Sequence, residues 1–253
     1  MNNINRLKLS SLILKKTKEF GADIVGITSV SELKNSPSHE QAGKISRLEI
    51  GKREQNLEPL EVKWPQDGKS VIVFAVSHPE TNPELDWWYG EYSPPGNQKL
   101  IKINKRLAEW INTSFPKVNI YKLPYSVEKG GIFLKDAAVK AGLGCMGQNN
   151  LLISPEYGPR VRLRAMIISE DLVSTGPISY NPCSSCEGFC IKKCPQKAFD
   201  EDGYKRFTCN IEMEENIKTS NVNKEIDFYE PTGEEVQLFK YCRSCEFTCP
   251  IGK

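Results

Sequence analysis

The sequence predicts a mixed α/β or α+β domain over residues 1–173, followed by a small cysteine-rich module over residues 174–253. Helix-like and strand-like hydrophobic patterns alternate through the first part, which is typical of mixed folds. Eight of the nine cysteines lie at or beyond Cys183, after a Pro-, Ser- and Gly-rich stretch at 174–182. A chain of 253 residues has room for one domain of ordinary size and one small module.

The first domain begins with a helix pattern and two strand patterns. Residues 7–20 carry apolar side chains among lysines, as an amphipathic helix does: Leu7, Leu12, Ile13, Leu14 and Phe20. The segment 22–28 (ADIVGIT) predicts a short strand. Residues 35–69 are polar, and their weak periodicity predicts no regular element. The segment 70–77 (SVIVFAVS) is a continuous apolar run rich in valine, which is typical of a buried strand.

The alternation continues to the end of the first domain. The expected elements are a Pro- and aromatic-rich loop (80–98), an amphipathic helix (100–111), a strand (118–123), a helix (132–141) and two strands (151–154 and 162–169). Gly142 and Gly144 follow the second of these helices, and glycine is common where helices end. The last two strands flank a turn at 155–159.

The module contains two cysteine runs, each ending in Cys-Pro. The ligand candidates are Cys183, Cys186, Cys190 and Cys194 in the first run, the isolated Cys209, and Cys242, Cys245 and Cys249 in the second run. Such spacing is typical of [4Fe–4S] clusters, in which the cysteine before proline ligates the other cluster. Eight cysteines therefore predict two clusters. By this crossover, the first set is Cys183, Cys186, Cys190 and Cys249, and the second is Cys194, Cys209, Cys242 and Cys245.

Zinc and disulfides are the alternatives for these cysteines. Zinc ribbons use pairs of C-x₂₋₄-C rather than a four-cysteine run that ends in Cys-Pro. Disulfides need an oxidising compartment, and residues 1–20 have neither a continuous apolar region nor a small-residue cleavage site. The middle gap of the first run is one residue longer than in the common bacterial run, and Gly188 in that gap relaxes the extra turn.

Composition narrows the function further. The formal net charge is +2 and 26% of residues are charged, so there is no strong nucleic-acid signature. No apolar run has the length of a membrane span, so we expect a soluble cytoplasmic protein. A G-x-G-x-x-G fingerprint and a P-loop are both missing. His39 and His78 are the only histidines, and we interpret both as ordinary satisfied or surface residues. Cys145 is interpreted as a small buried residue, with a reactive thiol as the alternative.

Two further features each allow two interpretations. The segment between Cys209 and Cys242 is acidic, which favours a solvated helix and loop over the clusters, and a docking surface for a basic electron donor is the alternative. Arg160 and Arg162 alternate at the start of a predicted strand, so they face one side. Either they brace the cluster module through Glu or Asp partners, or they bind a corrinoid side chain, a phosphate or a substrate carboxylate. Tyr157 is interpreted as a packing residue.

The stretch from 128 to 169 closely resembles the region that precedes the clusters in epoxyqueuosine reductases and reductive dehalogenases. The matching text is AGLG at 141–144, Gly147, Asn149, LLI at 151–153 and PEYGPRVRL at 155–163. The strand segments ADIVGIT and SVIVFAV and the eight cysteines fit the same family. The resemblance covers most of residues 8–253.

This resemblance implies a cobalamin-dependent reductase. Members of the family hold a base-off corrinoid on a nitroreductase-like domain, and a ferredoxin-like module with two [4Fe–4S] clusters passes electrons to its cobalt. The absence of a D-x-H-x-x-G motif, which would offer a histidine as lower cobalt ligand, is compatible with base-off binding. The expected corrinoid contacts are Gly142, Leu143, Gly144, Met146, Gly147, Asn149 and Arg160.

The resemblance also directs attention to the residues before the AGLG text. Epoxyqueuosine reductases place a catalytic Asp thirteen residues before its first Ala, and the gapless count lands here on Glu128. Glu128 or Tyr125 is therefore the expected proton donor, although the extra methylene of Glu moves the acid by about 1 Å. A surface Glu beside Lys129 is the alternative. The chain lacks the helical-repeat domain that helps queuosine enzymes hold tRNA, so tRNA is a doubtful partner.

Three functions follow. The first is a reductase of a modified nucleoside, a halogenated or other organic compound, or another protein's corrinoid, with ferredoxin or flavodoxin as its low-potential electron donor. The second is an electron-transfer or corrinoid-reactivating protein without a small-molecule substrate. The third is a family member that has lost cobalamin and keeps only cluster electron transfer.

Overall fold

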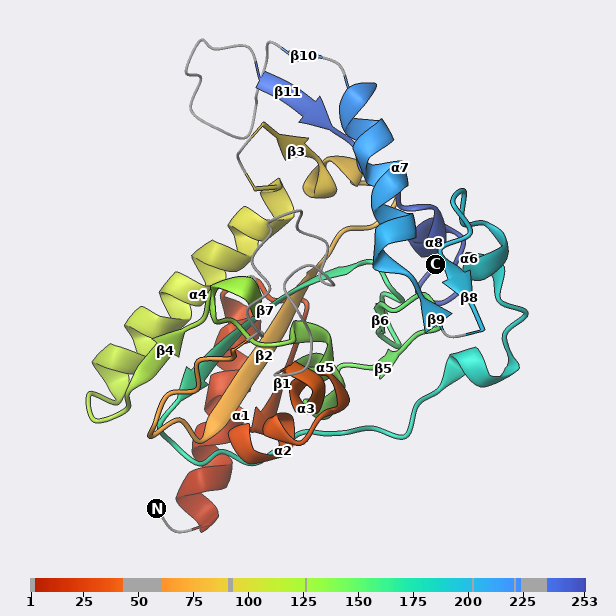
Figure 1. Ribbon diagram of the computed structural model, residues 1–253. Coiled ribbons are helices and arrows are strands. Elements are labelled where there is room, and N and C mark those ends of the chain that lie inside the picture. Colours follow the sequence, from red (N-terminus) through yellow and green to blue (C-terminus); the bar gives the residue numbers. More distant parts are fainter. Residues whose placement is uncertain are drawn as a thin grey trace.

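The computed structural model describes residues 3–42, 61–90, 93–125, 127–201, 203–220, 222–223 and 236–253 (Figure 1). Its centre is a four-stranded antiparallel sheet in the order β1-β2-β7-β4. The strands are β1 (Ile24–Ser29), β2 (Ser70–Ser77), β7 (Val161–Ile168) and β4 (Ile120–Lys122). The mixed fold expected from the sequence is therefore present, with antiparallel central strands.

Helices cover both faces of this sheet. On one face, α1 (Asn3–Glu19) and α4 (Pro95–Ser114) pack against residues such as Phe74 and Met166. On the other, α2 (Val30–Lys34) and α5 (Leu134–Lys140) pack against residues such as Val73 and Leu163. Alternate residues of β2 thus enter different cores, which explains why seven of its eight residues are buried and why its sequence is a continuous apolar run.

The buried face of α1 differs from the one the sequence suggested. Leu7 and Leu12 are 58% and 38% exposed, whereas Leu9 and Ile13 are buried together with Thr17. The spacing of four residues between these three positions defines a helical face that includes a polar residue. Thr17 fits there because its Oγ1 donates a 2.7 Å hydrogen bond to the carbonyl oxygen of Ile13.

The remaining elements are short. They are α3 (Pro37–Gln41), η3 (Pro83–Asp86), β3 (Trp88–Tyr89), η4 (Val127–Lys129), β5 (Cys145–Met146), β6 (Leu152–Ile153), η5 (Pro182–Ser185), α6 (Phe189–Lys192), β8 (Phe199–Asp200), β9 (Gly203–Tyr204), α7 (Arg206–Lys218), β10 (Val222–Asn223), β11 (Val236–Phe239) and α8 (Ser244–Phe247). The sequence pattern missed α2 and α3, and part of the 35–69 segment lies outside the described residues. Strands β6 and β7 do not pair with each other, because β6 pairs with β5 and β7 with β2 and β4.

The two parts of the chain are joined by more than the connecting segment. Strand β11 pairs with β3, so the cysteine-rich part adds strands to one from the first part. Thr175, in the expected linker, exchanges hydrogen bonds with Ile27 of β1 and donates a 2.6 Å bond to the carbonyl oxygen of Ala141. The start of this segment is thus packed on the central sheet.

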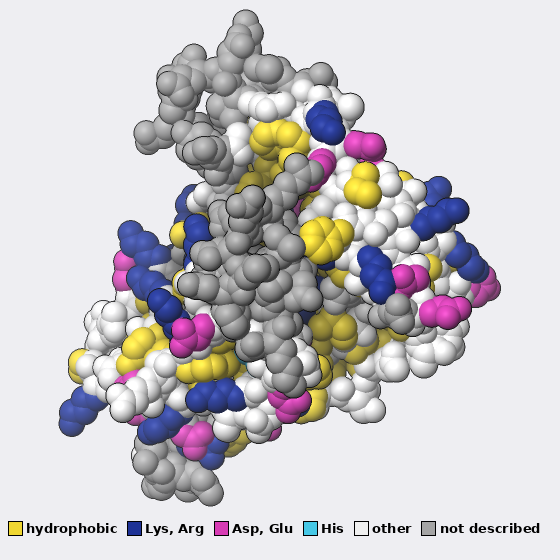
Figure 2. All heavy atoms as spheres, viewed as in Figure 1, with side chains coloured by type: hydrophobic (Ala, Val, Ile, Leu, Met, Phe, Trp, Pro, Cys, Tyr) yellow, Lys and Arg dark blue, Asp and Glu magenta, His cyan; other side chains and the backbone are white. Residues whose placement is uncertain are grey.

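The surface carries both charges, and hydrophobic side chains show over α7 (Figure 2). Helix α7 has no buried side chain among its described residues, in keeping with a solvated helix, and Phe207 and Ile211 are exposed on it. The rest of the acidic segment lies largely outside the described residues. None of the helices in the described part of the chain combines the length and apolar character needed to cross a bilayer.

Candidate functional site

The first predicted set of cysteines comes together around α6. Cys183 lies in η5, Cys186 follows it, Cys190 is in α6, and Cys249 follows α8. Burial raises the pKa of the Cys190 thiol, and the charges of Cys183, Cys249 and Cys186 raise it further. Burial also raises the pKa of Cys249, with contributions from Cys183 and Cys186. These mutual interactions join the same four residues that the crossover rule selects.

Three members of the second predicted set are likewise close to one another. Burial raises the pKa of Cys245 to about 12, and Glu246, Cys242 and Cys209 add to the effect. Cys209 lies on α7, where it forms a side-chain hydrogen bond with Tyr204. Cys194, the fourth member, accepts a 3.3 Å hydrogen bond at Sγ from the backbone N–H of Ala198.

The residues present fit two iron–sulfur clusters. Burial is the main cause of the raised pKa values of Cys190 and Cys245, and neighbouring cysteines add to it, so bound iron would stabilise the thiolates of this region. Cys190 also contributes to the shift of Cys245, so the two sets are neighbours. Among the described residues, no three His, Cys, Asp or Glu side chains converge as ligands of a single metal ion. The fit therefore depends on the grouping of the thiols.

A hairpin from the first part of the chain reaches both cysteine sets. Strands β5 and β6 are closed by a turn in which Gly147 N–H donates to the carbonyl oxygen of Leu151 at 2.8 Å. At its tip, Gln148 Nε2 donates to the carbonyl oxygen of Cys183 at 3.3 Å. Asn149 Nδ2 donates to the carbonyl oxygen of Cys245 at 3.4 Å. The hairpin thus lies directly against one ligand loop of each set.

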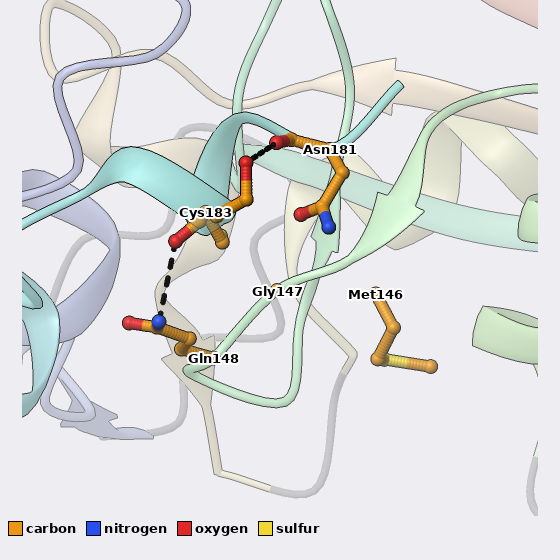
Figure 3. Close-up of a pocket in the computed structure, with 6 residues that line it drawn as sticks. Met146, Gly147, Gln148, Asn181 and Cys183 are labelled. Atoms are coloured by element: carbon orange, nitrogen blue, oxygen red, sulfur yellow. Dashed lines mark hydrogen bonds between the residues drawn. The ribbon is translucent and has the colours of Figure 1, made fainter. Parts of the chain in front are cut away.

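A pocket of about 280 Å³ opens beside this hairpin (Figure 3). Its lining consists of Met146, Gly147, Gln148, Asn181, Cys183 and Ser184. In Figure 3 the Gln148 side chain points toward the Cys183 backbone, and Asn181 comes from the segment just before η5. The pocket is smaller than the range typical of whole ligand sites, so it has room for part of a large cofactor.

The residues expected to contact a corrinoid divide into two groups. Met146 and Gly147 line the pocket, and Asn149 joins the hairpin to Cys245. Gly142 and Gly144, by contrast, are packed against backbone, because a Cβ on them would come within 2.8 Å of the Thr175 oxygen and 2.1 Å of the Ile153 oxygen. Leu143 is part of the hydrophobic core. Packing explains why Gly142, Leu143 and Gly144 occur at these positions. Contact between them and a corrinoid stays a prediction.

Arg160 and Arg162 both brace the structure. Arg160 is 3% exposed, and its acceptors are the main-chain carbonyl oxygens of Glu246, Cys249 and Ile251. We expected Glu or Asp partners for Arg160, but it is held by hydrogen bonds to main-chain carbonyl oxygens instead. Arg162 pairs with Asp86 and its guanidinium lies over the Trp88 ring, so its carboxylate partner is in the first part of the chain and not in the cluster module.

The two expected proton donors lie on the segment that follows β4. Tyr125 is 48% exposed. The backbone of Glu128 lies in η4, while its side chain is outside the description. Sequence reasoning missed Lys135 on the neighbouring α5, which donates a 2.5 Å hydrogen bond to the carbonyl oxygen of Asn150. Burial lowers the pKa of Lys135 to about 8, aided by the charge of Arg206.

The structure places both histidines in the interior. His39 is 9% exposed, with Nδ1 2.8 Å from Ser36 Oγ, and its Nε2 accepts from the Phe133 N–H at 3.1 Å. His78 is 3% exposed and belongs to a buried cluster of charged residues that joins the two parts of the chain. The other members are Asp86, Arg162, Arg243 and Glu246. Together with His78, these residues come from four separate segments of the chain. No local sequence pattern could therefore predict the cluster.

Cys145 lies in β5 with intermediate exposure. Burial raises the pKa of its thiol, and the charge of Cys183 raises it further. The ninth cysteine is thus a neighbour of the first set, and the expectation of a small buried residue holds only in part.

The fold and the site together define a mixed α/β protein with two groups of cysteines beside a pocket. No family model matches the chain. An epoxyqueuosine reductase from Lactococcus garvieae is 28% identical over 225 residues, which cover 85% of this chain and 60% of that protein. One from Listeria monocytogenes is 34% identical over 205 residues, 74% of this chain and 49% of that protein. A tetrachloroethene reductive dehalogenase from Sulfurospirillum multivorans is 31% identical over 121 residues, 46% of this chain and 23% of that protein.

Solved structures show the same fold. The epoxyqueuosine reductase from Streptococcus thermophilus matches with a TM-score of 0.66 at 21% identity, covering 97% of this chain and 66% of that one. A catabolic reductive dehalogenase matches with a TM-score of 0.60 at 16% identity, covering 98% of this chain and 32% of that one. The chain belongs to the epoxyqueuosine reductase and reductive dehalogenase-like family. It spans 60% or less of the length of the Lactococcus, Listeria and Sulfurospirillum relatives.

Proposed function

We propose that this protein is an iron–sulfur oxidoreductase that uses a base-off corrinoid to reduce a substrate. The observation that carries the proposal is the hairpin 145–153, which contacts the ligand loops of both cysteine sets and borders the pocket. Electron transfer needs donor and acceptor centres close together, and this hairpin brings the predicted corrinoid side of the molecule against the cysteines. Membership of the family supports the same function.

In this proposal each part of the chain has a separate task. The first set (Cys183, Cys186, Cys190 and Cys249) and the second set (Cys194, Cys209, Cys242 and Cys245) each hold one [4Fe–4S] cluster in a ferredoxin-like module, 174–253. The nitroreductase-like domain, 1–173, binds the corrinoid through Met146, Gly147 and Asn149. When bound, the corrinoid supplies a strongly reducing cobalt centre. A low-potential carrier such as ferredoxin or flavodoxin is the proposed electron donor, and the cytoplasmic location stays a prediction.

The segment 125–129 is the proposed source of the proton that a reduction consumes. Glu128 occupies the position of the catalytic Asp in the family text, and the exposed Tyr125 is its neighbour along the chain. A Bacillus subtilis epoxyqueuosine reductase has been solved with its catalytic Asp loop swung out of the active site. The substrate is a modified nucleoside, a halogenated or other organic compound, or another protein's corrinoid. An epoxyqueuosine reductase has been solved with a modified tRNA stem loop, but this chain gives no independent sign of a tRNA partner.

Metal analysis and spectroscopy of oxygen-free protein test the proposal. About eight irons per chain and a broad visible absorbance are expected for two cubanes. Added cob(II)alamin should then give the EPR spectrum of the base-off form. If the protein holds clusters but does not bind cobalamin, electron transfer by the clusters is the only one of the three functions that remains. Cobalamin binding without turnover of any free substrate would favour a corrinoid-reactivating protein. Zinc in place of iron would contradict the whole proposal.

A further inference from the structure

The end of the chain lies directly against the turn that precedes β7. The guanidinium of Arg160 holds three successive parts of this end: Nη1 donates to the carbonyl oxygens of Glu246 at 2.8 Å and Cys249 at 3.4 Å, and Nη2 donates to that of Ile251. A planar guanidinium suits this task because its donors have fixed directions. Arg160 is 3% exposed, so these bonds are shielded from water.

Two glycines allow the two backbones to meet. Gly158 has a φ of +56°, and a Cβ on it would come 2.0 Å from the carbonyl oxygen of Ile251. Gly252 has a φ of +74°, and a Cβ on it would come 2.2 Å from the carbonyl carbon of Tyr157. Both positions need a conformation and a clearance that only glycine provides. Contact between the turn and the chain end is therefore built into both segments.

The charge of Arg160 is directed at this contact. Its acceptors are main-chain carbonyls, and no carboxylate in the described residues pairs with it. The Arg160 guanidinium lies 3.4 Å from the carbonyl oxygen of Cys249. A positive charge this close to a cluster ligand stabilises the extra electron of the reduced cluster, because that electron is added negative charge.

We propose that Arg160 is a positioning residue for Cys249: it fixes the thiolate that completes the first cluster and raises the reduction potential of that cluster. The inference rests on the proposed function, because it assumes that Cys249 is a cluster ligand. Arg160 acts from the first part of the chain on a ligand from the end of the second. The two parts must therefore be docked before the first cluster is complete.

Four variants separate position from charge. Arg160→Gln removes the charge and most of the donors, whereas Arg160→Lys keeps the charge and loses the planar fork. Gly158→Ala keeps the arginine but displaces the chain end, with the new Cβ 2.0 Å from the Ile251 oxygen and 3.2 Å from Arg160 Nη2. Arg164→Gln is the matched control, since Arg164 lies on β7 and is half-buried but forms no hydrogen bond with the chain end among the described residues. Each variant is purified without oxygen and compared by iron content, by EPR of the reduced protein and by potentiometric titration.

The expected results differ among the variants. In Arg160→Gln, the potential of one cluster falls and that of the other stays unchanged. In Arg160→Lys, the potential stays close to that of the wild type. In Gly158→Ala, iron content falls by as much as half, with the EPR signal of one cluster lost. Arg164→Gln keeps both signals and both potentials.

Two outcomes would overturn the inference. One is an Arg160→Gln variant with full iron content and both potentials unchanged. If that variant does not fold, a Gly158→Ala variant with wild-type iron content and EPR spectra decides against it. A wild-type chain that binds no cluster would instead overturn the proposed function together with this inference. Wild-type clusters with unresponsive variants would overturn this inference alone.

Discussion

Arg243 donates a hydrogen bond from Nη2 to the carbonyl oxygen of His78, 2.8 Å away and 165 residues earlier in the chain. The same guanidinium contacts the His78 ring, and its Nε lies 2.8 Å from a Glu246 carboxylate oxygen and 3.6 Å from one of Asp86. Arg243 thus reaches from the cysteine-rich part into the first part, as Arg160 reaches in the opposite direction. Arg243 lies within the second cysteine run, and Arg160 donates to the carbonyl oxygens of Glu246 and Cys249 in the same run.

The first prediction concerns the stability that Arg243 contributes. Arg243→Met leaves the buried Glu246 without its nearest cation and weakens the neutralisation of Asp86. Removal of one partner of a buried ion pair costs about 3–5 kcal/mol. We expect a loss of that size in the free energy of unfolding, measured by denaturant titration of protein with verified iron content.

The exposed pair Lys105–Glu109, at 3.9 Å, provides the control. Lys105→Ala should change the free energy of unfolding by less than about 0.5 kcal/mol, because exposed pairs contribute little. An Arg243→Met variant that behaves like Lys105→Ala would show that the buried cluster is not a stabilising connection.

The second prediction is a dependence of stability on pH that comes from His39. Burial lowers the pKa of His39 to about 4, an effect that the charge of Asp136 partly opposes. In the unfolded chain His39 binds a proton as the pH falls through about 6.5, whereas in the folded protein it does not. The contribution of neutral His39 to the free energy of unfolding is therefore complete above that pH. It declines as pH falls from about 6.5 toward 4, by up to about 1.4 kcal/mol per pH unit.

Comparison of wild type with His39→Gln isolates this effect. The variant should be less stable at pH 7.5, because the Phe133 N–H loses a well-placed acceptor. Its free energy of unfolding should then decline less steeply between pH 6.5 and 5. Parallel declines in the two proteins would mean that His39 is not the titrating group. His78, also neutral and buried, titrates in both proteins and cancels in the comparison.

The sequence was informative wherever one local pattern determines the structure. The run 70–77 predicted β2 with the same bounds, because a strand buried on both faces must be apolar throughout. The crossover of Cys249 to the first set follows from Cys-Pro spacing alone and stays a prediction. Features made by distant residues could not be predicted. Examples are the Arg243–His78 bond and the pairing of β11 with β3, which depend on how separate segments dock.

The third prediction compares the iron content of three cysteine variants, one from each predicted set and one at Cys145. Cys249→Ser and Cys209→Ser should each remove about half of the iron, with loss of a different EPR signal in each case, because the two residues belong to different sets. Cys145→Ser should keep the wild-type iron content, although Cys145 is a neighbour of Cys183. Equal effects of Cys249→Ser and Cys209→Ser on one and the same signal would contradict the assignment of the sets.

The last prediction concerns Glu128 as a proton donor. Glu128→Gln keeps the size of the side chain and removes its acid, so it should lower turnover by about 10²–10⁴-fold while iron content and cobalamin binding remain unchanged. Glu128→Asp restores the acid and the side chain length of the family, and should recover a large part of the rate. Tyr125→Phe tests the other expected donor in the same assay. If Tyr125→Phe is inactive and Glu128→Gln is active, the phenol supplies the proton. If both variants turn over at the wild-type rate, the proton comes from neither residue, and the carry-over of the family's catalytic position to this chain fails.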